Sequence, residues 1–183
     1  MAEKIKKNTF YTKYPLSSVV LYNGSTILHF LLGGAGIYLS FSSWAGPLLA
    51  VIYLVFAFVQ MYLIMPLTVC SRCPYYKLEN GRCISALNLL SRRITTPGLP
   101  HDFLRRAKGP LCHNYQYLAA LIVPVPLMLL GLVLNFSVAL LVILGVVVLL
   151  LVERFLFLFP KVACIHCVAK HKCPNAAQMG LNK

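Results

Sequence analysis

Two long stretches of the chain contain no charged residue, and their hydrophobic positions run continuously rather than in alternation. The first stretch lies between Lys13 and Arg72, and the second between Lys108 and Glu153. A helix needs about 20 residues to cross the hydrocarbon core of a bilayer, so each stretch is long enough for two spans. A break at "SFSSWAGP" and a turn at "NFS" divide them. The pattern predicts spans over residues 17–41, 46–67, 117–134 and 138–159.

The predicted fold is an all-α integral membrane protein, a bundle of four transmembrane helices built from two helical hairpins. The bilayer core holds no water to satisfy backbone polar groups, so helices are the economical spanning form. A β-barrel would alternate apolar and polar positions, whereas this chain has continuous runs of Leu and Val. The chain then divides into an N-terminal segment (1–16), hairpin 1 (17–67), a Cys-rich basic loop (68–116), hairpin 2 (117–159) and a Cys-rich tail (160–183).

Composition supports a membrane protein. The chain is 59% hydrophobic and 11% charged, whereas soluble domains carry about 25% charged residues. Seventeen basic residues against four acidic ones give a net charge of +13. In a soluble chain this charge would suggest nucleic-acid binding. With so apolar a chain we expect no nucleic-acid partner, and we interpret the charge as the bias of cytoplasmic loops toward Lys and Arg.

The positions of the basic residues predict the orientation. The turns "SFSSWAG" and "NFS" carry no Lys or Arg. The N-terminal segment, the central loop and the C-terminal end carry Lys4, Lys6, Lys7, Lys13, Arg72, Lys77, Arg82, Arg92, Arg93, Arg105, Arg106, Lys108, Lys161, Lys170, Lys172 and Lys183. We therefore expect a protein of the inner (cytoplasmic) membrane, in contact with the lipid bilayer, with both termini and the central loop in the cytoplasm. The first apolar stretch is longer than the core of a signal peptide, so we expect it to be retained.

The cysteines fall on the side that this orientation places in the cytoplasm. The central loop holds Cys70, Cys73, Cys83 and Cys112, and the tail holds Cys164, Cys167 and Cys173. Structural disulfides are rare in a reducing compartment. Cysteines with this spacing therefore indicate metal or redox chemistry.

The two halves of the chain end alike. Pro66 precedes Cys70 by four positions, and Pro160 precedes Cys164 by four positions. Each half then continues with Cys-x2-Cys and a third cysteine. This pattern suggests a parallel duplication, which would bring the two cysteine segments together under one bundle. We expect each proline to end its helix just before the cysteines.

The ligand count suits two four-coordinate metal sites. A Cys-x2-Cys turn places two thiolates within reach of one tetrahedral ion. The candidate ligands are Cys70, Cys73, Cys83, Cys112 or His113 in the loop, and Cys164, Cys167, Cys173 with His166 or His171 in the tail. Alternatively, Cys70, Cys73, Cys164 and Cys167 close one site between the halves. Zinc and an iron–sulfur cluster both suit such ligands. The opposing interpretation is thiols without metal, or palmitoylation sites beside the spans.

A few polar residues and prolines interrupt the apolar spans. We expect His29 to bond to a serine or to a polar group on another helix. No second histidine lies in a span to complete a bis-histidine haem site. Arg154 is expected to snorkel toward the interface, and Glu153 is expected to pair with Arg154 or with a neighbouring base. Pro124 and Pro126 predict a kink or unwinding in the third span.

These features predict a small, cysteine-rich membrane subunit that transfers electrons within a larger complex through a cytoplasmic metal module. An iron–sulfur cluster is favoured over zinc because it explains why cysteines lie beneath a bundle that can meet a lipid quinone. The expected partners are other membrane and cytoplasmic subunits and a quinone, and we expect an electron-transfer or non-catalytic subunit rather than a stand-alone enzyme. The alternatives are a zinc-stabilised anchor or scaffold without a redox role, or a membrane protein that handles thiols or a soft metal such as Cu(I).

Overall fold

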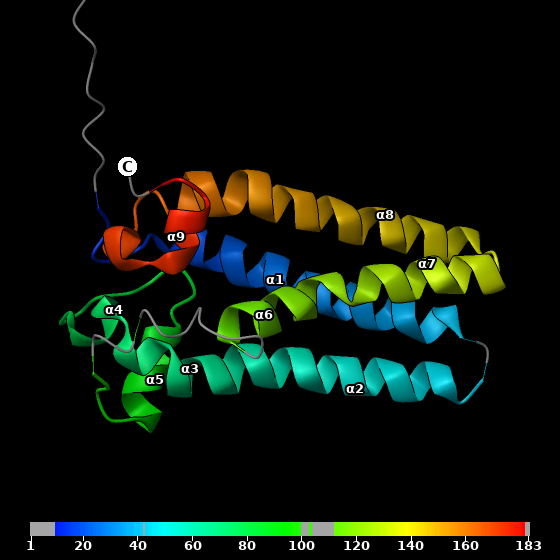
Figure 1. The fold of residues 1–183 in the computed structure, drawn as a ribbon, viewed down its shortest axis with the longest axis horizontal. Coiled ribbons are helices and arrows are strands. Elements are labelled where there is room, and N and C mark those ends of the chain that lie inside the picture. The colour runs from blue at the N-terminus through cyan, green and yellow to red at the C-terminus, as the bar shows by residue number, and fades with distance from the viewer. Residues whose placement is uncertain (1–9, 42, 100–102, 104–111, 182–183) are drawn as a thin grey trace, which may run out of the picture.

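The computed structural model describes residues 10–41, 43–99, 103 and 112–181, and this part of the chain is helical and without strands (Figure 1). Within these residues, four helical stretches are long and apolar enough to cross a membrane: Leu16–Ser40, Ala45–Arg72, His113–Leu134 and Val138–Ala163. For the described residues, the prediction of an all-helical protein with four helices long and apolar enough to span a membrane is confirmed. The second and fourth stretches extend past the predicted ends, and both extensions reach toward a cysteine pair.

Each long stretch is divided into shorter elements. The first is α1 (Leu16–Ser40) alone, and the second comprises α2 (Ala45–Val59), η1 (Gln60–Ile64), α3 (Met65–Thr68) and η2 (Cys70–Arg72). The third comprises α6 (His113–Ile122) and α7 (Pro124–Leu134), and the fourth comprises α8 (Val138–Glu153) and η4 (Arg154–Ala163). Outside the spans lie α4 (Pro74–Lys77), α5 (Leu87–Ile94), η5 (Lys170–Lys172) and α9 (Pro174–Gln178).

Helix α1 is the central element of the bundle and packs against α2, α7 and α8 (Figure 1). Small residues on α1 allow this close packing, as expected at helix interfaces inside a membrane. Gly33 lies against Pro124 of α7 and the Tyr53 hydroxyl of α2, and Gly36 lies against Met128 of α7. The short elements α4, α5 and α9 gather at one end of the bundle (Figure 1).

The third span is broken at Pro124, as its prolines predict. Helix α6 ends at Ile122 and α7 begins at Pro124. Proline has no N–H, so the carbonyl four residues before it, that of Ala120, loses its helical donor. The Tyr53 hydroxyl donates to this carbonyl over 2.9 Å. The ring of His29 donates from Nε2 to the next carbonyl, that of Leu121, over 2.9 Å, which confirms that His29 bonds to a polar group on another helix.

The prediction that Pro66 and Pro160 end their helices is wrong. Pro66 lies inside α3, and Pro160 lies inside η4. Wide π-helical turns accompany both prolines: the Met65 N–H donates to the Gln60 carbonyl, and the Cys164 N–H donates to the Phe159 carbonyl over 2.7 Å. In such a turn the hydrogen bonds reach back five residues. In this wider turn the carbonyl four residues before the proline does not clash with the proline ring. The helix can therefore continue past the proline.

The two π-helical segments begin at equivalent positions of the two halves. Gln60 begins η1 six positions before Pro66, and Arg154 begins η4 six positions before Pro160. Both side chains are buried, with exposed fractions of 1% and 0%. The resemblance between the halves therefore extends from the proline–cysteine spacing to a buried polar residue at the start of a widened turn.

The contact between α1 and α7 can be tested at Gly131. A methyl group there would meet the Ser40 side chain and lie 2.7 Å from the Ser40 Cα atom, which cannot rotate away. We expect Gly131→Ala to lower the free energy of unfolding by about 1–3 kcal/mol, the usual cost of overpacking. Thermal unfolding in detergent micelles measures the change.

Gly145→Ala is the matched control, because a methyl group at Gly145 of α8 meets nothing within 4 Å. This change should be neutral or stabilising by up to about 1 kcal/mol through helix propensity. Equal unfolding temperatures for the two variants would contradict the packing described here.

Candidate functional site

Four cysteines from both halves of the chain surround two small buried clusters. Cys73, Cys83 and Cys167 pack around the first cluster, whose buried residues are Tyr14, Val19 and Tyr75. Cys73, Cys167 and Cys173 pack around the second, whose buried residues are Val69, Phe103 and Ala169. We call Cys73, Cys83, Cys167 and Cys173 the cysteine layer. Cys73 and Cys167 belong to both clusters, so the layer joins the central loop to the tail.

The N-terminal segment lies between the loop and the tail and hydrogen-bonds to both. The Tyr11 N–H donates to the His166 carbonyl over 2.8 Å, and the Tyr14 N–H donates to the Arg82 carbonyl over 2.9 Å. The Arg82 N–H in turn donates to the Thr12 carbonyl over 3.1 Å. The Tyr14 hydroxyl also donates to the Ala163 carbonyl at the end of η4. This segment therefore fixes the position of Arg82, next to Cys83, relative to the segment that carries Cys167.

Two arginines of the central loop are structural. Arg82 donates from Nε and Nη2 to the Tyr14 carbonyl over 3.0 and 2.7 Å. Arg92 donates to the carbonyls of Tyr75 and Tyr76, each over 2.8 Å, and also to that of Leu78. Arg92 thus satisfies carbonyls at the end of α4 that have no helical donor. Of the basic residues used to predict orientation, Lys4, Lys6, Lys7, Arg105, Arg106, Lys108 and Lys183 lie outside the described residues.

Two tyrosine hydroxyls are buried within the cysteine layer. The Tyr75 hydroxyl donates to the Tyr11 carbonyl over 2.5 Å. Burial raises the pKa of Tyr14 and of Tyr75 well above the usual tyrosine range, and the nearby Cys167 thiol raises both pKa values further. Both hydroxyls therefore stay protonated and remain hydrogen-bond donors at neutral pH.

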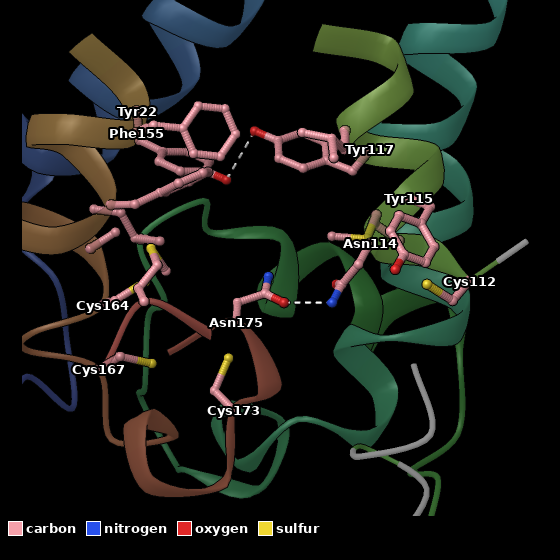
Figure 2. A pocket seen from close by; sticks show the side chains of 16 residues that line it. Tyr22, Cys112, Asn114, Tyr115, Tyr117, Phe155, Cys164, Cys167, Cys173 and Asn175 are labelled. Atoms are coloured by element: carbon pink, nitrogen blue, oxygen red, sulfur yellow. Dashed lines mark hydrogen bonds between the residues drawn. The ribbon is translucent and has the colours of Figure 1, made fainter. Parts of the chain in front are cut away.

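A pocket of about 280 Å³ lies beside the cysteine layer, between α6 and η4 (Figure 2). Five aromatic residues line it: Tyr22, Tyr115, Tyr117, Phe155 and Phe159. Cys112, Cys164, Cys167 and Cys173 also line it. Figure 2 shows Cys112 beside Tyr115, well apart from the three tail cysteines. The side chain of Asn114 donates to that of Asn175 over 2.5 Å, which links α6 to the tail at the pocket.

A buried arginine contacts two of the tyrosines that line the pocket but does not line the pocket itself. Arg154 donates from Nη1 to the Tyr117 hydroxyl over 2.6 Å and from Nη2 to the Ser25 hydroxyl over 3.1 Å. Its guanidinium also lies 5.6 Å from the centre of the Tyr22 ring, close enough for a cation–π contact. These contacts place the charge among α1, α6 and η4.

The predictions that Arg154 snorkels and that Glu153 pairs with it are therefore wrong. The side chain is fully buried rather than directed to the interface, and within the described residues it forms no ion pair with Glu153. The Nε atom of Arg154 and the Oε2 atom of Glu153 are both buried, and neither has a hydrogen-bond partner among the residues that the structure describes. Consecutive residues of a helix point in different directions, so Glu153 cannot face the polar group that Arg154 meets.

The other predicted ligands lie in different surroundings. Cys70 packs against the main core of the bundle. The His166 ring stacks on Tyr11 at 4.5 Å, and the His171 ring packs edge-on against Phe10 at 5.9 Å. His113 begins α6. Across the described parts of the chain, no three His, Cys, Asp or Glu side chains are positioned to hold a metal ion as they stand. Metal ligation by the ten candidate residues therefore stays a prediction.

The sequence reasoning missed Tyr22, Tyr117 and the N-terminal segment. Tyrosines near the end of a span are ordinary interface anchors, and no motif marks Tyr22 or Tyr117. Their importance depends on Arg154, which is 37 positions from Tyr117 along the chain. The one available signal was Arg154 itself, since a charged residue within a span requires polar partners.

No family model, no curated protein and no solved structure matches this chain. The fold and the site define its class: a helical membrane protein with four apolar helices and a cysteine-rich end. The function has to be argued from the residues of that end.

The buried tyrosines predict a loss of stability at high pH. The unfolded chain ionises its tyrosines near pH 10.0, whereas Tyr75 in the folded protein keeps its proton. The folded state then binds more protons than the unfolded state, so stability falls as the pH rises above about 10. Tyr75→Phe removes this contribution and should make the fall shallower by up to about 1.4 kcal/mol per pH unit. Thermal unfolding across the alkaline range measures the slope, and an unchanged slope would contradict the burial of this hydroxyl.

Proposed function

We propose that this chain is a membrane subunit whose cysteine layer binds an iron–sulfur cluster and passes electrons between a cytoplasmic partner and the membrane. One observation carries the proposal: Cys73 of the central loop and Cys167 of the tail pack against the same two buried clusters. Segments about ninety positions apart in the sequence thus contribute thiols to one small region. Such convergence is typical of a shared ligand set rather than of scattered surface thiols.

The composition of the cysteine layer supports metal binding. It supplies four thiols, and four thiolates suit either an iron–sulfur cluster or zinc. Each of the four is half-buried, so a bound centre would be shielded from bulk water. Binding would require rotation of the thiols toward a common point. This variant of the predicted site, closed between the two halves, uses Cys83 and Cys173 in place of Cys70 and Cys164.

The adjoining pocket favours an electron-transfer role over a purely structural one. Cys167 and Cys173 belong to the cysteine layer and also line the aromatic pocket. A redox centre in the layer would therefore lie against a site for a second molecule. Zinc is the second candidate, because α4 and α9 are too short to have cores of their own, and zinc binding supplies folding free energy to such segments. In that case the chain would be a zinc-stabilised anchor or scaffold.

We place the cysteine layer in the cytoplasm. The short elements α4, α5 and η5, the segment before α1 and the last turns of η4 hold exposed basic residues, among them Lys13, Lys77, Arg93, Lys161 and Lys172. The turns at the opposite end carry no Lys or Arg. The rule that basic residues remain on the cytoplasmic side then supports two hairpins with both termini and the central loop in the cytoplasm.

Reporter fusions at the C-terminus test this orientation. A green fluorescent protein fused after residue 183 should fluoresce in a bacterial host, and an alkaline phosphatase fused there should be inactive, because that enzyme needs the oxidising periplasm for its disulfides. Fusions in the turn between α7 and α8 should give the reverse result. An active phosphatase at the C-terminus would refute the cytoplasmic placement.

Metal analysis of anaerobically purified protein tests the metal centre. We expect iron with acid-labile sulfide, and an electron paramagnetic resonance signal in either the reduced or the oxidised protein. Cys73→Ser and Cys167→Ser should each lose most of the iron, because each removes a thiolate contributed by a different half.

Cys112→Ser is the matched control, because Cys112 lines the pocket away from the cysteine layer (Figure 2), and it should keep the iron. Stoichiometric zinc in a colourless sample would contradict the redox function and support the zinc-stabilised anchor. A metal-free wild-type protein, or full metal content in both Cys73→Ser and Cys167→Ser, would refute the metal site.

A further inference from the structure

The buried guanidinium of Arg154 imposes a direction on the hydrogen bond at the Tyr117 hydroxyl. An arginine only donates hydrogen bonds, so the Tyr117 oxygen must accept from Nη1. The hydroxyl hydrogen of Tyr117 is then left to donate elsewhere. Its nearest partner is the Tyr22 hydroxyl at 3.5 Å, which is at the limit of a hydrogen bond. Both hydroxyls belong to residues that line the pocket (Figure 2).

The Arg154 guanidinium, which contacts these two tyrosines, has no anionic partner within the described residues. Arg154 has an exposed fraction of 0%, and its Nε has no hydrogen-bond partner in the part of the chain that the structure describes. A buried charge without a counter-charge is costly. An electron-rich oxygen in the pocket, hydrogen-bonded to Tyr117, would reduce that cost through the Arg154–Tyr117 hydrogen bond. The Tyr117 side of the pocket therefore favours an acceptor oxygen.

Aromatic and aliphatic side chains form much of the remaining lining and suit a flat ring. Phe155 and Phe159 contact each other edge-to-face at 5.4 Å. Further apolar lining comes from Met65, Ile84, Leu118, Ala163 and Met179. The pocket volume of about 280 Å³ is close to the lower end of ligand pockets, about 300 Å³. This space fits one substituted ring rather than a whole lipid.

The rim of the pocket is exposed on the outside of the helix bundle. Tyr115 and Phe155, on α6 and η4, are 55% and 38% exposed. Helix α6 packs mainly against α2, α7, α1 and η1, so the pocket occupies the space on its η4 side. In a bilayer, a ligand with an apolar tail could enter here and leave the tail among the lipids.

We propose that the pocket binds the ring of a membrane quinone, with one carbonyl oxygen accepting a hydrogen bond from the Tyr117 hydroxyl. The choice of a quinone among ring-bearing lipids rests on the electron-transfer function proposed above. The binding itself requires only the pocket. Arg154 acts as a positioning residue, because it orients the hydroxyl of Tyr117 without lining the pocket itself.

Calorimetric titration of the detergent-solubilised protein with decylubiquinone tests the site. Tyr117→Phe keeps the ring and removes the donor, so the affinity should fall about tenfold, the equivalent of one hydrogen bond near a charge. Phe155→Ala should weaken binding to a similar degree by opening one wall. Phe157→Ala is its matched control, because Phe157 is an exposed aromatic residue on η4 that does not line the pocket, and it should bind as the wild type does.

The same titration separates this inference from the proposed function. Cys73→Ser, which should lack metal, should still bind decylubiquinone, because Cys73 does not line the pocket. A metal-loaded wild-type protein that does not bind decylubiquinone would overturn the quinone site and leave the metal site standing. Equal affinities for the Phe155→Ala and Phe157→Ala variants would also overturn it. So would tighter binding of oleate than of the quinone, since oleate offers a carboxylate and no ring.

Discussion

The backbone of Tyr11 to Tyr14 holds the two cysteine-bearing segments side by side. Its N–H and C=O groups bond to the backbone near Cys83 on one side and at His166 on the other. These segments are short, so backbone hydrogen bonds and two buried tyrosine hydroxyls fix their relative positions together with the two small buried clusters. The shared contacts of Cys73 and Cys167 depend on this arrangement, and so does the wall that the tail contributes to the pocket.

The structure combines two polar systems that are separate in sequence. One is the cysteine layer at the end of the bundle, and the other is the Arg154–Tyr117–Ser25 network within it. The pocket lies between them. The cysteine layer contributes Cys167 and Cys173 to its lining, and the network contributes Tyr117. A redox centre and a site for an electron-rich ring would gain from this proximity, because electron transfer requires short distances. The pairing of the two systems thus supports the proposed function more strongly than either does alone.

The spans could be predicted from sequence because their signal is local: long uncharged stretches can only be satisfied as helices in a bilayer. The break at Pro124 and the match between Gln60 and Arg154 were also predictable, since both follow from proline positions. The continuation of the helices past Pro66 and Pro160 was not predictable, because a π-helical turn leaves no mark in the hydrophobic pattern.

The N-terminal segment was missed for a similar reason: "YTKY" shows no periodicity, and its role depends on partners that are distant in the chain. The surroundings of Arg154 required knowledge of which helices meet, which composition does not provide.

The placement of Arg154 has a consequence for biosynthesis. Its two hydrogen-bond partners, Ser25 and Tyr117, belong to the first and third spans, and both are synthesised before it. Insertion of the fourth span beside the first and third spans therefore brings its guanidinium to polar partners within the bilayer. These partners offset part of the energetic penalty of placing a charge in a span. Truncation from the C-terminal side would leave the earlier spans intact, whereas loss of the first span would leave a charged helix for quality-control proteases to recognise.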